Sequence, residues 1–322
     1  MIKLDANFYS CHSLQQFFEP LSPDLVALQL SRGPLQGRLR IFHCGALRFN
    51  LLETNQTLFL SGARRPEPCT LAFPFRPPTA LSPCRAQGIS VAWPALIGYN
   101  SQLTDFDLRV PAGTHIATIV IGRNTLLEQL ERRGGDKLTL ERLKNTNQLE
   151  LLPESLYGIR DQIEQLIRLG KNGWSPAVSD QLIEIILRSF AAPQVRTRFV
   201  RKREPRHEAA IDLLHWLSNK PNEIVTIEEL AEKLHYSRTT IFKGAREHFE
   251  RTPLQVQRSI RLDRVRHLLL NPTLRTTLGL KGVVDSATTM GFSSRSHFAQ
   301  RYQEQYGEDP QTTLNQGLRL ER

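Results

Sequence analysis

The sequence is short of cysteine and contains no long apolar run. Its four cysteines lie far apart in the first third of the 322 residues and form no CxxC pair, so we expect free thiols rather than a disulfide or a zinc site. They are Cys11, Cys44, Cys69 and Cys84. No window approaches about 18 uninterrupted apolar residues, and the N-terminus lacks a basic start followed by an apolar stretch. These absences argue against export and against a membrane span, and they predict a cytoplasmic protein.

The composition is that of an ordinary globular protein. Apolar residues make up 40% and charged residues 23% of the chain, which excludes wholesale disorder. Because single domains usually run to about 100–200 residues, a chain of 322 residues predicts two domains.

The net charge of +10 is unevenly distributed along the chain. Between His235 and Gln303 there are twelve Lys and Arg residues against four Asp and Glu residues, so 8 of the 10 excess positive charges lie within 69 residues. Such clustering is typical of a surface that binds phosphate groups. Many basic helices are merely solvated, however, and charge alone leaves both interpretations open.

Four segments differ in their sequence patterns. Residues 1–122 contain short apolar runs separated by Gly, Pro, Asn and Ser, which predicts a β-sandwich or barrel. Residues 123–192 carry amphipathic helical patterns. Residues 193–207 combine prolines with a basic run, as a linker does, and residues 208–322 form one helical pattern after another.

The segment 123–192 predicts three helices. Thr125, followed three residues later by Glu128, predicts a capping box at the start of the first. Two amphipathic helices are expected over 154–169 and 177–190. Their apolar faces can pack on the β-rich domain or on a second subunit, and we expect a homodimer.

Two similar turns occur in the last third of the chain. Thr226 and Glu229 predict a capping box that opens a helix, His235 is expected to end that helix at positive φ, and Ser237 to cap the next. A second stretch repeats the pattern, with Ala287, Gly291, Phe292 and Ser293 matching Ala231, His235, Tyr236 and Ser237, and with Pro310 matching Pro253. The repeat predicts two helix-turn-helix units. Ordinary core helices that share a turn are the alternative.

A long helix is predicted between the two units, over "PLQVQRSIRLDRVRHLLL". Its buried stripe is expected to consist of Leu254, Ile260, Leu262, Val265, Leu268 and Leu269, and its other faces are expected to carry Arg258, Arg261, Arg264 and Arg266. A rigid helix would fix the spacing of two units that enter DNA one helical turn, about 34 Å, apart.

The last third of the chain resembles the tandem helix-turn-helix domain of the AraC/XylS family of bacterial transcription regulators. The resemblance is carried by Ala231–Pro253, by "IRLDRVRHLLL", and in the second unit by Gly291, Phe292, Ser296, Phe298, Tyr302, Tyr306, Gly307 and Pro310. As in that family, the second unit has one more residue between turn aromatic and proline, 18 against 17. Departures from the family pattern are His235, Ala245, Glu250 and Ser286. The resemblance implies an all-α C-terminal domain that binds double-stranded DNA.

Candidate DNA contacts lie on the outer faces of the second helix of each unit. The first unit offers Arg238, Thr239, Phe242, Lys243 and Arg246, and the second offers Ser294, Arg295, Ser296 and Gln300. The resemblance puts base contacts of the first unit on Thr239, Phe242 and Lys243. Phe242 can pack on a thymine methyl, Arg295 can bind guanine and Gln300 adenine. Phosphate contact is the alternative for each residue.

The resemblance also implies a cupin-like N-terminal domain that senses an effector. The stretch "VPAGTHIATIVI" is similar to a cupin strand pair, but His43 and His115 stand alone, so we expect neither a metal cofactor nor catalytic residues. Aromatic residues can line a ligand pocket or belong to the core. They are Phe49, Phe59, Phe73 and Trp93.

Three functional hypotheses follow. The first is a sequence-specific transcription regulator, controlled by a small molecule or by its own dimerisation, with double-stranded DNA, a second copy of the chain and RNA polymerase as candidate partners. The second is a cupin-type enzyme with a helical appendage. The third is a nonspecific DNA-binding protein. The sequence leaves open the effector, the operator and the direction of regulation.

Overall fold

The chain folds into two compact units, each of which combines several segments. The computed structural model describes residues 2–65, 67–75, 84–169, 176–200 and 202–320. The N-terminal unit consists of Met1–Asn7, Arg38–Thr54 and Ala63–Lys202. The C-terminal unit consists of Phe8–Gly37, Asn55–Gly62 and Arg203–Arg322. Two early segments of the sequence therefore belong to the C-terminal unit.

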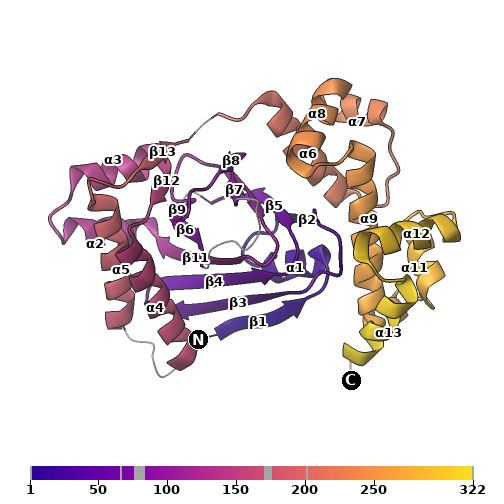
Figure 1. The fold of residues 1–322 in the computed structure, drawn as a ribbon, viewed down its shortest axis with the longest axis horizontal. Coiled ribbons are helices and arrows are strands. Elements are labelled where there is room, and N and C mark those ends of the chain that lie inside the picture. The colour runs from indigo at the N-terminus through magenta and orange to yellow at the C-terminus, as the bar shows by residue number, and fades with distance from the viewer. Residues whose placement is uncertain (1, 66, 76–83, 170–175, 201, 321–322) are drawn as a thin grey trace. The chain divides into compact units, whose positions relative to one another are not determined.

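A large sheet forms the centre of the N-terminal unit (Figure 1). Its strands, in spatial order, are β1 (Ile2–Phe8), β3 (Gly37–Cys44), β4 (Leu47–Thr54), β11 (His115–Gly122), β6 (Pro68–Pro74), β9 (Ala95–Ile97), β12 (Thr146–Glu150) and β13 (Thr197–Phe199). β11 pairs antiparallel with both β4 and β6, which puts Ile119 opposite Phe49 and Leu71. All three side chains are fully buried, so this register fixes the centre of the core.

The β-rich character predicted for this region is confirmed, but the cupin-like barrel is not. Over the described residues, the large sheet runs in open order from β1 to β13. The stretch "VPAGTHIATIVI" was expected to hold a strand pair. Instead, the stretch begins with the last residue of β10 (Asp105–Val110) and continues into β11, and these two strands belong to different sheets. β10 pairs with β7 (Arg85–Ala86), and β7 pairs with β8 (Ile89–Ser90), whereas β11 lies in the large sheet.

Helices complete the described part of the N-terminal unit. They are α2 (Arg123–Glu131), α3 (Lys137–Asn145), α4 (Pro153–Leu169) and α5 (Pro176–Ala191). The two amphipathic helices predicted from the sequence are α4 and α5, and their apolar faces are buried in the core of this unit through residues such as Ile159, Ile163 and Ile186. These faces therefore provide no argument for a dimer. The predicted cap at Thr125 is wrong, because α2 already begins at Arg123 and its N-cap residue, Gly122, has no side chain.

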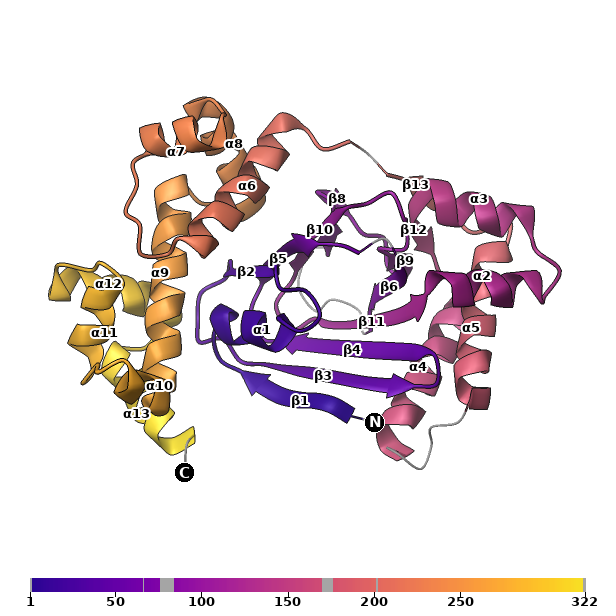
Figure 2. The ribbon, with the colours of Figure 1, turned by 180° about the vertical axis from the view of Figure 1, so that it is seen from behind.

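The C-terminal unit is mainly helical (Figure 2). Its later segment forms α6 (Pro205–Asn219), α7 (Ile227–Leu234), α8 (Arg238–Phe249), α9 (Pro253–Leu270), α10 (Pro272–Thr277), α11 (Val283–Thr289), α12 (Arg295–Tyr306) and α13 (Pro310–Leu320). Its early segments form α1 (Cys11–Phe18), β2 (Val26–Gln29) and β5 (Leu58–Ala63), and β2 pairs antiparallel with β5. One apolar cluster joins α6, α7, α8 and the first half of α9, and a second joins the rest of α9 to α11 and α12.

The long helix predicted between the two units is α9, but its burial differs from the prediction. Leu254, expected in the buried stripe, is 45% exposed, whereas Arg266 is fully buried and Arg261 is 8% exposed. The reason is that other elements surround α9: α8, α11 and α13 pack against it, and so does α1 from the early part of the chain. A helix covered on several sides keeps little solvated surface for its arginines, and Arg258 and Arg264 are half-buried.

Candidate DNA interface

The first helix pair, α7 and α8, is held together by the local signals that the sequence shows. The Thr226 hydroxyl accepts from the Glu229 amide at 3.2 Å, and the Glu229 carboxylate accepts from the Thr226 amide at 2.7 Å. His235 ends α7 with φ 57°, and the Ser237 hydroxyl caps α8 by accepting from the Thr240 amide at 3.1 Å. The capping box, the left-handed turn and the second cap are all confirmed.

The second helix pair, α11 and α12, has a longer turn. Gly291 has φ 74°, and a Cβ there would overlap with the Arg261 guanidinium, so both the backbone conformation and the packing favour glycine at this turn. The cap of α12 is Ser294, whose hydroxyl accepts from the His297 amide at 3.4 Å. The predicted match of Ser293 with Ser237 is therefore wrong. The second helix pair has one more residue in its turn than the first, and this residue, Ser293, lies between Phe292 and the cap Ser294.

With the caps aligned, α8 and α12 correspond along their whole length. Each helix has 12 residues, begins with an arginine directly after a serine cap, and is followed by a left-handed residue, Glu250 or Gly307. The outward positions then match as Arg238 with Arg295, Thr239 with Ser296, Phe242 with Ala299, Lys243 with Gln300 and Arg246 with Gln303. Alignment by the caps adds Gln303, which sequence reasoning missed because it aligned the turns by their first serine.

Comparisons with known proteins concern mainly this region. Residues 230–316 match the model of a family described as a helix-turn-helix domain. The XylDLEGF operon transcriptional activator 2 of Pseudomonas putida is 26% identical over 103 residues, which are 32% of this chain and 63% of the activator. A probable AraC family transcriptional regulator from Rhodopseudomonas palustris is 25% identical over 34% of this chain and 97% of its own, with a TM-score of 0.31. The C-terminal region contains a helix-turn-helix domain of the AraC type.

Two solved structures match more of the chain at lower identity. The AraC-like transcriptional activator CuxR is 13% identical over 77% of this chain and 92% of its own, with a TM-score of 0.41. ToxT from Vibrio cholerae is 11% identical over 91% of this chain and 96% of its own, with a TM-score of 0.32.

The outer face of α8 in this AraC-type domain carries the predicted residues. Four of the five are exposed, and Phe242 is half-buried. Arg238 donates to Glu228 of α7 at 2.8 Å, and this hydrogen bond lowers the pKa of the exposed Glu228 carboxyl. DNA that binds Arg238 would therefore have to break this ion pair. The cost would be small, because exposed ion pairs contribute little to stability.

The outer face of α12 carries the other four predicted residues. Arg295, Ser296 and Gln300 are exposed and Ser294 is half-buried. Gln300 donates to Glu304 at 3.1 Å, within the same helix. Over the described residues Arg295 has no ion pair, so it is available to a ligand without breaking one.

Charge in the AraC-type domain is less available to phosphate than its sequence suggests. Of the twelve cations between His235 and Gln303, three are buried in structural roles: Arg261 donates to the Met290 carbonyl, Arg266 to Glu308, and Arg275 to the Leu268 and Leu269 carbonyls. Six cations are exposed, namely Arg238, Lys243, Arg246, Lys281, Arg295 and Arg301. Two of these begin the corresponding helices α8 and α12.

Family departures are accommodated in the AraC-type domain. Glu250, in place of a glycine, takes a left-handed conformation with φ 57°, as His235 does. Ala245 is fully buried against the first apolar cluster. Ser286, in place of an apolar residue, is also fully buried, and its hydroxyl donates to the Gly282 carbonyl at 2.8 Å.

A cavity of about 480 Å³ lies in the N-terminal unit. It is lined by Arg40, Leu51, Leu52, Glu53, Phe75, His115, Ile116, Glu164, Ile167 and Arg168. None of the four aromatic residues considered for a pocket lines it: Phe49 and Phe73 are fully buried core, Trp93 packs against that core, and Phe59 belongs to the C-terminal unit. Within the described residues we find no group of three metal-ligating side chains, and no helix there is long and apolar enough to cross a membrane.

Proposed function

We propose that this chain is a sequence-specific DNA-binding transcription regulator in which both helix pairs act as helix-turn-helix units. The observation that carries the proposal is the correspondence of α8 and α12, two helices of equal length with equivalent caps and equivalent exposed first-turn arginines, joined by α9. Helices related in this way can each enter a major groove when about 34 Å separates them along the DNA.

The proposed readers are the outward residues of α8 and α12. In α8 they are Arg238, Thr239, Phe242, Lys243 and Arg246, and in α12 they are Ser294, Arg295, Ser296, Gln300 and the additional Gln303. Arginine can bind guanine through two hydrogen bonds, glutamine can bind adenine in the same way, and Phe242 can contact a thymine methyl. The remaining polar side chains suit phosphate contacts that fix the register.

The N-terminal unit is proposed to sense a small-molecule effector in its cavity. Its lining combines apolar side chains, among them Leu51, Phe75 and Ile116, with charged side chains. Arg40 forms an ion pair with Glu53 at 2.5 Å, which leaves Arg168 of α4 as the exposed cation of the lining. This chemistry suits an amphiphilic molecule with an anionic or hydrogen-bond-accepting end.

The wider setting is also part of the proposal. A transcription regulator would act in the bacterial cytoplasm, where it can contact RNA polymerase at a promoter. A homodimer stays a prediction, which sedimentation analysis of the purified chain would test. The cupin-like character of the sensor domain also stays a prediction.

Competition for DNA tests the proposed function against nonspecific binding. Fragments bound in the native cell are mapped, and the strongest fragment is used as a labelled probe. We expect unlabelled copies of this fragment to displace the protein at far lower concentration than random DNA of equal length, because specific binding usually exceeds nonspecific binding by about 10³-fold or more. Equal displacement by both competitors would contradict sequence-specific regulation.

A further inference from the structure

Two early segments of the chain form part of the C-terminal unit. They are Phe8–Gly37 and Asn55–Gly62, here called the brace, and they include α1, β2 and most of β5. They lie about 150 or more residues before the helices that they contact. Their contacts extend to both helix pairs and to α9.

The brace completes the apolar core of the first helix pair. Val26 and Leu28 of β2 and Phe59 of β5 are buried in the same cluster as α6, α7 and α8. The Phe59 ring meets the Phe249 ring edge-on at 5.0 Å, and the Ser61 hydroxyl lies 3.0 Å from the His215 imidazole of α6. Removal of these side chains would leave part of this core open to water.

α1 docks on the middle of α9 through buried polar groups. The Asp263 carboxylate accepts from the Cys11 amide at 2.7 Å and from the His12 amide at 2.8 Å. These two amides belong to the first turn of α1, where a carboxylate satisfies unpaired donors and the positive end of the helix. The His267 imidazole lies 3.1 Å from the Ser13 hydroxyl, so two successive turns of α9 hold α1.

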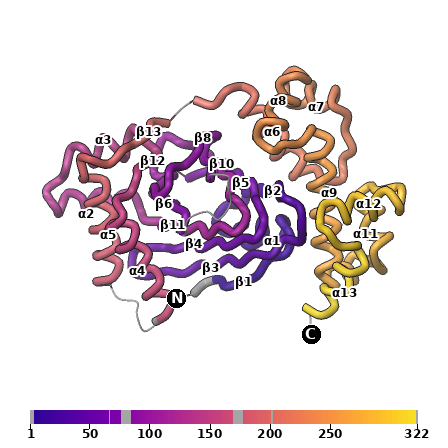
Figure 3. The backbone as a smooth tube through the Cα atoms, viewed as in Figure 1, coloured from indigo at the N-terminus to yellow at the C-terminus, as the bar shows by residue number. Residues whose placement is uncertain are grey.

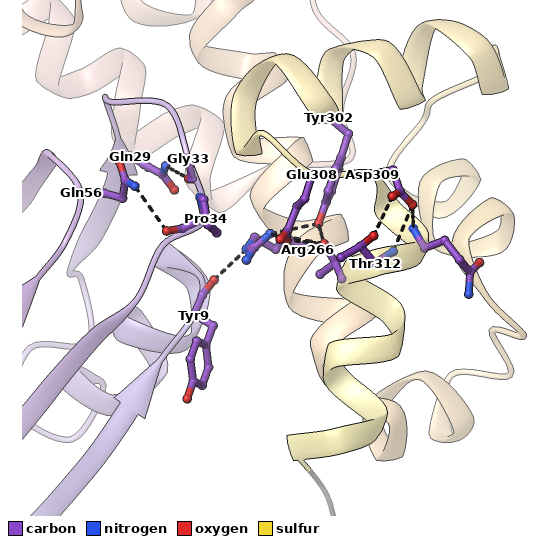
Figure 4. A network of polar contacts seen from close by, with 12 residues as sticks. Tyr9, Gln29, Gly33, Pro34, Gln56, Arg266, Tyr302, Glu308, Asp309 and Thr312 are labelled. Carbon is purple, nitrogen blue, oxygen red and sulfur yellow. Dashed lines mark hydrogen bonds and ion pairs between the residues drawn. The ribbon is translucent and has the colours of Figure 1, made fainter.

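Arg266 connects the brace to the second helix pair (Figure 4). Its fully buried guanidinium donates to the Tyr9 carbonyl at 3.0 Å and to the Glu308 carboxylate at 2.6 Å. Glu308 lies two residues before the start of α13, and the Tyr302 hydroxyl of α12 lies 3.4 Å from the same guanidinium. A fully buried arginine requires such a set of acceptors, so these elements depend on one another.

Arg251 and Gln305 connect both helix pairs to the brace at a second place. Arg251, just beyond α8, donates to the Leu30 carbonyl at 3.0 Å and to the Gln305 side chain at 3.2 Å. The side-chain amide of Gln305 in α12 donates to the Ser31 carbonyl at 3.1 Å. The backbone carbonyl of Gln305 accepts from the Gly33 amide at 2.9 Å. The end of α8 and the end of α12 are thus attached to the same four residues, 30–33.

We infer that the brace fixes the angle and separation of α8 and α12, with Arg251 and Gln305 as positioning residues. Across the described residues, α9 is the element that the two apolar clusters share, so without the brace their relative orientation would depend on α9 and on the direct Arg251–Gln305 hydrogen bond. Two recognition helices that must meet successive major grooves need a fixed separation. This inference rests on the proposed function for its meaning on DNA, but its geometric part can be measured without DNA.

Distance measurements between spin labels test the geometric part. The four native cysteines are buried, so labels can be attached selectively to a full-length Lys243→Cys, Gln300→Cys protein that marks α8 and α12. We expect one narrow distance distribution in this background. Gln305→Ala removes two side-chain contacts but keeps a residue that favours helix, and it should broaden the distribution. Gln311→Ala, at an exposed position of α13, is the matched control and should leave the width of the distance distribution unchanged.

A second variant keeps the test decisive if Gln305→Ala destabilises the fold. Arg251→Met preserves much of the side-chain length but removes three hydrogen bonds, including one to Ser259 at 2.7 Å, with Arg319→Met as its control. Circular dichroism and thermal melts verify that each protein is folded. Unchanged distributions in a folded Gln305→Ala or Arg251→Met protein would overturn the inference.

A change of spacing in the DNA tests the functional part. One base pair is inserted into the bound fragment between the sequences protected by α8 and by α12, which rotates one against the other by about 35°. We expect the wild-type affinity to fall about tenfold or more and that of Gln305→Ala by less than about threefold. Equal losses would overturn the inference. If the wild type does not prefer its fragment over random DNA, the proposed function fails, and the label distances still decide the role of the brace.

Discussion

Arg238 and Arg295 occupy the same position at the start of α8 and α12, but their surroundings differ. Arg238 already donates to Glu228, whereas Arg295 has no ion pair over the described residues. A guanine that binds Arg295 therefore breaks no ion pair within the protein, and none of the energy of the bidentate pair is spent on breaking one.

Replacement of Arg295 by alanine should weaken binding to the specific fragment by about 1–3 kcal/mol and binding to random DNA much less. Fluorescence anisotropy with both duplexes measures the two losses. Arg319→Ala, which removes an exposed arginine near the end of α13, should leave the ratio unchanged. Equal losses of Arg295→Ala on both duplexes would show that Arg295 contacts only phosphate.

Gly244 is the residue at which a single methyl group should damage the domain most. It lies inside α8 where α6 crosses, and a Cβ there would overlap with the Arg206 backbone carbonyl. Alanine favours helix by up to about 1 kcal/mol over glycine, but backbone cannot move aside as a side chain can.

Gly244→Ala should therefore lower the free energy of unfolding by about 2 kcal/mol or more, as measured by urea denaturation. Gly158→Ala provides the comparison, because it is also a helical glycine and its Cβ would meet only the tip of Ile185 at 3.3 Å. A Gly244→Ala protein as stable as Gly158→Ala would contradict this packing.

At the scale of elements, the two threonines predicted as caps offer a matched pair. Thr226 caps α7 through a complete capping box, whereas Thr125 lies inside the first turn of α2 and is not its N-cap residue. Thr226→Ala should cost about 1 kcal/mol of stability. Thr125→Ala should cost only a few tenths of a kcal/mol, within the range of ordinary surface substitutions. Thermal melts of the two variants decide this, and a larger loss for Thr125→Ala would show that the caps are assigned wrongly.

Sequence reasoning succeeded where a feature depends on residues close in the chain. The Thr226 box, the left-handed His235 and the long α9 all follow from local chemistry. It failed at Ser293 because two adjacent serines offer the same local signal, and only the start of α12 shows that Ser294 is the cap. The residues that face outward on α8 and α12 were predicted from helical periodicity, except Gln303. Their contacts with DNA stay a prediction.

The burial of Arg266 could not be predicted from the sequence. Its acceptors are Tyr9, from the first ten residues of the chain, and Glu308, from the last fifteen. Periodicity describes one helix at a time, so an arginine on α9 is expected to be solvated unless the partners from distant segments are known. The brace could not be predicted for the same reason, because residues 8–37 pack against α9 only through long-range contacts.

For the whole molecule, the brace is covalently continuous with the two strands that line the cavity proposed to bind an effector. β3 and β4 are neighbouring strands of the large sheet (Figure 3). They carry Arg40 and Glu53, which line the cavity. The brace ends at Gly37, three residues before Arg40, and resumes at Asn55, two residues after Glu53. A ligand that shifts either strand would therefore act on chain segments that hold α8 and α12.

Two histidines between α1 and α9, the half-buried His12 and the buried His267, should make the stability of this discontinuous unit depend on pH. Burial, with the nearby Arg264 charge, lowers the pKa of His12 to about 3 and that of His267 to about 4. The folded state thus holds both imidazoles neutral, while the unfolded chain takes up protons as the pH falls below about 6.5. The contribution of these two pKa shifts to the free energy of unfolding is therefore complete above about pH 6.5. It falls below that pH by up to about 1.4 kcal/mol per pH unit for each histidine.

His267→Gln should therefore remove part of the loss of stability between about pH 7 and about pH 5, a window above the usual range of carboxyl groups. The measurement is the free energy of unfolding in urea across this window, with the exposed His297→Gln as the control. Burial raises the pKa of Asp263, and this raised pKa makes the folded state more stable as the pH falls, opposite to the effect of the histidines. Both proteins retain Asp263, so most of its contribution cancels in the difference between their slopes. Identical slopes for the wild type and His267→Gln would show that α1 does not shield His267 from water.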